Sequence, residues 1–269
     1  MMLWKGTAAR AVAALLLMAA LPWPIGCRSV EEAPPVAEHP PPVAQPLSDA
    51  DGEKAPKPIA EKPVPIGNVQ VYREQGYAEA PAEICLRAGV LDFLAVAPES
   101  GKEYESLFRL HCRPSSLHAA LLALGARPGR IPEAFRFQRD GGMAPEEAAR
   151  PVGDRIRIRV VRHEADGSAV TMPMELLVTD RATQRSPARL EWIFTGSFFA
   201  PSPDGDGDAY VADLERLAVS MLHHSACVLN VASDAGSPYR GADKGYEINE
   251  SGLPPEGARL SLRFVVEEE

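Results

Sequence analysis

The sequence is short of three things: aromatic residues, basic charge and long apolar runs. Phe, Trp and Tyr make up 6% of the 269 residues, so the core has to be built mainly from Leu, Val, Ile and Ala. Lys and Arg number 28 against 37 Asp and Glu. The formal charge of −9 argues against a protein that wraps nucleic acid. The apolar run Ala11–Leu21 is shorter than the roughly 20 residues that cross a bilayer as a helix.

Catalytic motifs are missing as well. There is no GxSxG nucleophile elbow and no glycine-rich phosphate loop, and His163-Glu164 lacks the second histidine of an HExxH zinc site. We therefore predict no catalytic residue and no cofactor. A binding or structural module is the favoured function class, and an enzyme of unrecognised chemistry is the alternative.

Residues 1–26 have the features of a signal peptide. Lys5 and Arg10 form its positive region, Ala11–Leu21 forms its apolar region, and two prolines then end any helix. The following PIGC, which ends at Cys27, resembles the lipobox of bacterial lipoproteins, in which the cysteine carries the lipid. We therefore expect an extracytoplasmic, membrane-anchored lipoprotein whose candidate partners are the membrane and an envelope protein. A secreted or periplasmic protein and a retained N-terminal anchor are the alternatives.

Residues 27–68 have the composition of a spacer. Ten of the 26 prolines fall between positions 28 and 66, a stretch without aromatic residues. Such a segment cannot bury enough apolar surface to offset the loss of backbone entropy, so we expect it to stay extended and disordered. It would hold a folded domain away from a membrane, and a proline-rich ligand for a partner is the alternative.

Residues 69–269 are predicted to form one domain of the α+β class, mostly antiparallel β-sheet with one clear short helix at about 115–124. Residues 82–98 suggest two short strands with a hinge near Gly89, and residues 104–112 suggest a third. Period-two alternation is clearest in DRIRIRVVRH, residues 154–163, as expected for a half-buried strand.

The predicted helix has one apolar face. Leu117, Leu121 and Leu124 recur at helical spacing, so this face is expected to be buried against the sheet. Ser115 stands where its hydroxyl could cap the first turn. His118 lies at the border of the apolar face, and we expect it to be solvated.

Several segments together resemble the YdjY-like domain of exported bacterial proteins. They are ICLRAGVLDFLAVAPESGKEYESLF, SSLHAALLALGARPG, LEWIFTGSFF, YVADLERLAVS and LPPEGARLSLRF, and they span most of residues 83–264. Tyr104 stands where the family commonly has a histidine, so a role for that histidine does not carry over. The resemblance implies an exported domain and brings no established activity with it.

An arginine face is the first candidate binding site. Arg155, Arg157 and Arg159 share one side of the alternating strand at residues 154–163. A solvated sheet surface explains them. If the face is functional, it would bind an anion or an acidic partner.

Two metal sites are candidates. The stretch MLHHSAC could supply zinc ligands together with the preceding histidine–cysteine pair, which gives the set His111, Cys112, His223 and Cys227. The loop PDGDGDAYVADLE has the oxygen-ligand spacing of an EF-hand, which gives the set Asp204, Asp206, Asp208 and Glu215. Strands around a turn explain the first stretch, and a polar loop explains the second. Ala209 also occupies the position where an EF-hand needs glycine.

The remaining cysteines have no pairing that spacing can fix. With Cys27 lipidated, an odd number of cysteines remains: Cys85, Cys112 and Cys227. One disulfide with one buried free thiol is one alternative. Three buried, unpaired cysteines are the favoured one, since a free cysteine behaves as a small apolar residue.

Overall fold

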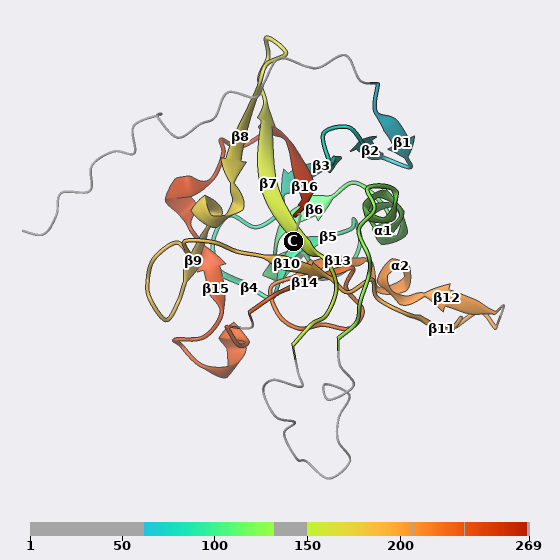
Figure 1. Ribbon diagram of the computed structural model, residues 1–269. Helices are drawn as coiled ribbons and strands as arrows, with labels where there is room; N and C mark the ends of the chain where they lie inside the picture. The colour runs from blue at the N-terminus through green and yellow to red at the C-terminus, as the bar shows by residue number, and fades with distance from the viewer. Residues whose placement is uncertain (1–61, 132–149, 206, 234, 268–269) are drawn as a thin grey trace, which may run out of the picture. The chain divides into compact units, whose positions relative to one another are not determined.

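A computed structural model describes residues 62–131, 150–205, 207–233 and 235–267 (Figure 1). The predicted signal peptide, Cys27 and most of the predicted spacer lie outside these residues. The first strand, β1 (Val64–Ile66), pairs with β2 (Val69–Tyr72), so the predicted spacer end at residue 68 is wrong. The side chain of Asn68 also donates to the carbonyl of His111 at 2.9 Å. None of the described helices has the length and apolar character needed to cross a membrane.

Eight strands close into a β-barrel. In ring order they are β3 (Tyr77–Ile84), β16 (Arg259–Val266), β7 (Arg155–His163), β10 (Trp192–Phe194), β14 (Leu229–Val231), β13 (Leu217–Ser220), β5 (Phe93–Val96) and β6 (Ser106–Leu110). One edge of β3 pairs with β16. Its other edge pairs with β2 along the first half of the strand and with β6 along the second half, and the pairing with β6 closes the ring. The chain therefore returns to the same strand after one circuit of the sheet.

Shorter elements surround the barrel. They are the edge strand β8 (Ala169–Pro173) on β7, the hairpin β11 (Phe199–Pro201) and β12 (Asp208–Tyr210), and the small sheet of β4 (Val90–Leu91), β15 (Tyr246–Ile248) and β9 (Val178–Asp180). The α-helices among the described residues are α1 (Pro114–Ala123) and α2 (Val211–Glu215). Figure 1 shows the β11–β12 hairpin projecting from the barrel beside α2.

The predicted α+β class is therefore wrong, because the protein is mostly β and its main sheet is a closed barrel. Two features of the barrel explain why sequence patterns did not predict it. Every residue of β5, β10, β13 and β14 is buried, so these short strands show no alternation. The pairs β5–β6 and β13–β14 are parallel and join segments that are not neighbours in a hairpin.

The alternating strand is confirmed as β7. Ile156, Ile158 and Val160 are buried to within 1%, and the arginines that alternate with them lie on the other face. The core that β7 helps to build is dominated by aliphatic residues, with a few fully buried aromatic rings, among them Trp192. The prediction of an aromatic-poor core is confirmed.

The predicted helix is confirmed within a residue at each end, but its cap is not Ser115. Ser115 lies inside the first turn of α1, and both its backbone N–H and its hydroxyl donate to the carboxylate of Asp213, at 2.8 and 2.6 Å. Arg113 pairs with the same carboxylate at 3.2 Å. A side chain of α2 therefore caps α1. The sequence around α1 alone does not predict this tertiary contact.

His118 is not solvated, contrary to the prediction. Its Nδ1 lies 2.8 Å from the Tyr210 hydroxyl, which itself donates to the carbonyl of Gly196 at 2.8 Å. Nδ1 also lies 3.1 Å from that carbonyl oxygen, which can only accept, so the tautomer protonated at Nδ1 satisfies this contact. The ring also stands edge-on to Phe194 with centroids 4.9 Å apart, and burial lowers the pKa of His118. The residue joins α1 to the β11–β12 hairpin.

Candidate functional site: two charged grooves on the outer face of the barrel

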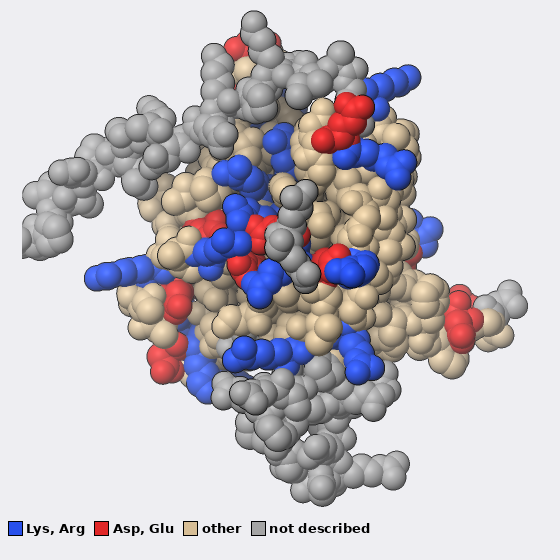
Figure 2. Space-filling view, viewed as in Figure 1, with Lys and Arg blue, Asp and Glu red and all other residues tan. Residues whose placement is uncertain are grey.

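Ionisable side chains gather on the outside of the barrel, where β3, β16 and β7 lie side by side. Because side chains alternate along a strand, the apolar residues of β7 fill the barrel and its arginines face outward. The register places Arg159 opposite Arg263 on β16, and Arg263 opposite Glu79 on β3. Figure 2 shows basic side chains with acidic ones between them at the centre of this face.

A groove of about 960 Å³ runs beside β7, and we call it the arginine groove. All three residues of the predicted arginine face line it. Its charged lining residues are Arg127, Arg155, Arg157, Arg159, Arg189, Asp154, Glu191 and Glu267. Five arginines against three carboxylates leave a formal charge of +2, in a protein whose total is −9.

Five of these side chains form an alternating chain of ion pairs. Arg155 pairs with one oxygen of Glu191, and Arg189 pairs with the other oxygen at 2.7 Å. Arg189 also contacts one oxygen of Glu267 at 2.7 Å, and Arg157 pairs with the other. Each carboxylate is thus held between two guanidinium groups, and Arg189 links the two halves.

Exposure within this chain is uneven. The side chains of Arg155, Arg157 and Arg189 are 58%, 42% and 52% exposed, whereas those of Glu191 and Glu267 are 22% and 15% exposed. A guanidinium carries more N–H donors than two carboxylate contacts use. The groove therefore turns donors toward solvent and keeps its acceptors underneath.

One end of the groove is fixed by Arg127 and Asp154. The carboxylate of Asp154 accepts from the backbone N–H of Arg127 at 2.8 Å and pairs with its guanidinium at 3.2 Å. Partial burial of Asp154 acts to raise its pKa, but the hydrogen bonds and the charge of Arg127 outweigh this and hold the pKa below its usual value.

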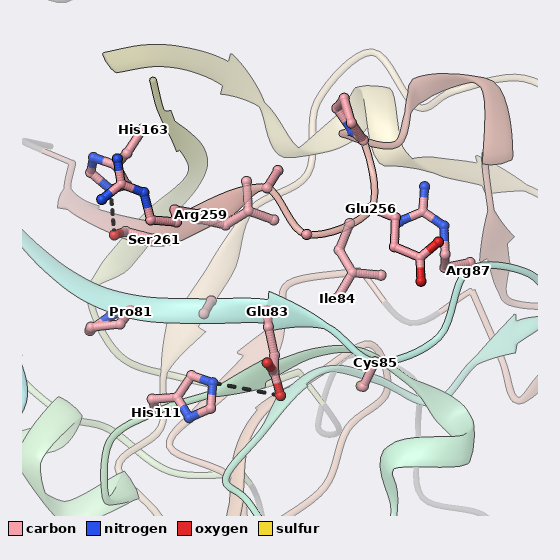
Figure 3. Close-up of a pocket in the computed structure, with 15 residues that line it drawn as sticks. Pro81, Glu83, Ile84, Cys85, Arg87, His111, His163, Glu256, Arg259 and Ser261 are labelled. Atoms are coloured by element: carbon pink, nitrogen blue, oxygen red, sulfur yellow. Dashed lines mark hydrogen bonds and ion pairs between the residues drawn. The ribbon is translucent and has the colours of Figure 1, made fainter. Parts of the chain in front are cut away.

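A second groove, of about 750 Å³, lies where β3 ends and β16 begins, and we call it the histidine groove (Figure 3). His163 and Ser261 stand on one wall, with His163 Nε2 2.7 Å from the serine hydroxyl. On the other wall, His111 Nε2 lies 3.7 Å from a carboxylate oxygen of Glu83.

The histidine groove does not have the geometry of a catalytic triad. Glu79 is the carboxylate nearest His163, but it approaches Nε2 at 3.5 Å, the same nitrogen that meets Ser261. A triad needs the carboxylate on the opposite ring nitrogen, where it orients the base. Cys85 also lines this groove, and burial raises its thiol pKa to about 11, which makes it a poor nucleophile.

The predicted zinc ligands are not brought together. Cys112 packs in the main core cluster and Cys227 in a separate smaller one, while His223 Nε2 contacts the carbonyl of Val231 at 3.0 Å. The stretch that carries His223 and Cys227 connects β13 to β14 and is not helical. Among the described residues, no three His, Cys, Asp or Glu side chains are grouped to hold a metal ion.

The predicted calcium ligands fall on the β11–β12 hairpin and the short helix after it. Asp204 lies in the hairpin turn, Asp208 begins β12 and Glu215 ends α2. Asp206 lies outside the described residues, so the full ligand set stays a prediction. The element is a hairpin followed by a helix of five residues, not the helix–loop–helix of an EF-hand.

The three described cysteines are all unpaired. Cys112 and Cys227 are buried as predicted, and Cys85 is half-buried. Burial raises the pKa of Cys112 to about 12, and burial also raises the pKa of Cys227. These thiols act as apolar core groups.

The fold and its grooves define a mostly β barrel domain with open, charged grooves on its outer face. The model of the YdjY domain family matches residues 75–265, so the chain belongs to the YdjY domain family, as the resemblance over residues 83–264 predicted. Comparison with curated proteins and with solved structures gave no match.

Proposed function

We propose that this chain is a lipid-anchored, extracytoplasmic binding module and that its arginine groove binds an anionic ligand. The observation that carries the proposal is the uneven exposure of the ion-pair chain. Its arginine side chains are exposed to solvent, whereas its carboxylates are largely buried beneath them. Guanidinium groups bind the oxygens of carboxylates and phosphates in two-pronged hydrogen bonds, and both chemistries fit this groove. The local charge of +2 would favour such a ligand despite the acidic whole.

Arg189 is the residue whose loss should weaken anion binding most, because it links both halves of the ion-pair chain. Titration calorimetry at physiological salt, where the Debye length is about 8 Å, with tripolyphosphate and separately with hexaglutamate measures the affinity and distinguishes phosphate from carboxylate ligands. We expect Arg189→Ala to bind about tenfold more weakly, which corresponds to one charged hydrogen bond.

Arg240→Ala is the matched control. It removes the same charge from an exposed arginine in the 3-10 helix η6 (Pro238–Arg240), which does not line the groove. We expect it to change the affinity less than twofold, since an exposed charge at a distance is screened by salt. Equal weakening by both substitutions would mean that net charge alone attracts the probe, and an absence of binding by the unaltered chain would reject the proposal.

The anchor rests on the sequence around Cys27, since no described residue bears on it. We expect Cys27→Ala to move the full chain from the membrane fraction to the soluble extracytoplasmic fraction, or to block its processing, because the lipid would have no attachment site. Cell fractionation with mass spectrometry of the N-terminal peptide measures this. An unmodified Cys27 on a chain that still sediments with membranes would contradict it.

A further inference from the structure

Glu267 occupies the place in the arginine groove that an anionic ligand would be expected to take. One of its carboxylate oxygens pairs with Arg157 and the other pairs with Arg189, so guanidinium groups contact the carboxylate from both sides. This is the geometry in which arginines hold a phosphate or carboxylate of a ligand. The side chain is only 15% exposed, so it fills its position.

Glu191 makes the same kind of contact but is anchored differently. It directly precedes β10, its carbonyl accepts from the N–H of Ala232 at 2.8 Å, and the next residue, Trp192, is fully buried. The backbone at Glu191 is therefore fixed in the barrel wall.

Glu267 follows the last residue of β16. Beyond the strand it is held by a backbone hydrogen bond from its N–H to the carbonyl of Arg155, at 3.0 Å. Swinging this carboxylate out of the groove requires no change in the strands. The two acids therefore carry equal charge and similar contacts, but Glu191 adjoins a fully buried strand, whereas Glu267 adjoins the half-buried end of β16.

We propose that Glu267 is an internal competitor: a phosphate or carboxylate group of the ligand displaces it and takes its place between Arg157 and Arg189. This inference rests on the proposed anion-binding function of the groove. It adds the position at which the ligand's anionic group binds and the residue that competes for that position. The exchange keeps both guanidinium groups paired, so neither is left without a counter-charge. Apparent affinity is then reduced by the fraction of molecules in which Glu267 fills the subsite.

Substitution of each acid by its amide separates displacement from charge. Glu267→Gln and Glu191→Gln remove the same charge from the same groove and keep nearly the same shape. With tripolyphosphate as the probe, we expect Glu267→Gln to bind about tenfold more tightly than the unaltered chain. Glu191→Gln should gain no more than about threefold, from the change of charge alone.

The outcomes distinguish this inference from the function on which it rests. Tripolyphosphate binding by the unaltered chain with equal gains in both variants would show a charge effect only and overturn the displacement. Binding with no gain in Glu267→Gln would place the ligand elsewhere and also overturn it. If neither the unaltered chain nor either variant binds, the proposed function itself fails. Thermal melts of the two variants verify that both are folded.

Discussion

Leu121→Ala is expected to lower the free energy of unfolding by about 2–5 kcal/mol, through lost burial and the cavity left behind. Leu121 is fully buried in the main core cluster, on the face of α1 that packs against β1, β2, β3 and β13. Urea denaturation followed by circular dichroism measures the change. Leu122→Ala is the matched control, because the neighbouring side chain is 48% exposed and should change stability by no more than about 0.5 kcal/mol.

The same experiment tests the corrected account of His118. The sequence suggested a solvated side chain whose removal costs little. The hydrogen bond to Tyr210 and the edge-on contact with Phe194 predict instead a loss of about 1–2 kcal/mol for His118→Ala. A result as small as that for Leu122→Ala would contradict these contacts, and equal results for Leu121→Ala and Leu122→Ala would contradict the packing of α1.

Gly153→Ala is expected to destabilise the fold by about 3 kcal/mol or more, or to prevent folding. A Cβ atom at this position would lie 2.1 Å from the carbonyl oxygen of Phe194, which is backbone and cannot move aside. That carbonyl also accepts from the N–H of Gly129 at 2.8 Å, and Phe194 in turn donates to Asp154 at 2.9 Å. The backbones cross closely at the base of the arginine groove.

Gly257→Ala supplies the comparison for Gly153→Ala. Its φ of +76° is unfavourable for alanine, but nothing lies within 4 Å of the added Cβ. It should therefore cost only the backbone strain, about 1–2 kcal/mol. Thermal unfolding of both variants measures the difference. If the two glycines tolerate alanine equally, the close crossing at Gly153 is not present in solution.

Local patterns predicted the parts of this fold that local patterns control. The alternation in residues 154–163 identified β7 and the outward face of its arginines, and helical spacing identified α1. Neither pattern carries information about which strands pair. Closure of the barrel depends on β3 pairing with β6 through Ala82, Glu83 and Ile84, a tertiary choice that no periodicity encodes.

The arginine groove was half predictable for the same reason. Arg155, Arg157 and Arg159 belong to one strand and share one face, whereas Arg189, Glu191 and Glu267 come from segments outside the strands. Only the pairing of β7 with β16 and β10 brings them together. Charged residues in irregular segments give no signal that separates a ligand-binding arginine from a solvated one.

The zinc candidate depended on helical spacing, and strands around a turn were the favoured explanation of the same stretch. His223 and Cys227 stand four residues apart, which places two ligands on one face only in a helix. The connection between β13 and β14 turns instead, and Cys227 is fully buried within the smaller core cluster. Histidine–cysteine spacing therefore needs a defined secondary structure before it indicates a metal site.

The most direct test of anion binding by the arginine groove is to locate the bound probe. Titration of the ¹⁵N-labelled domain with tripolyphosphate, followed by amide chemical shifts, reports where the probe sits. Binding in the arginine groove predicts that the largest shifts fall at residues 153–159, 189–191 and 265–267, which line or adjoin the groove. Shifts confined to the histidine groove, at residues 81–87, 111 and 255–261, or spread evenly over exposed lysines and arginines, would contradict it.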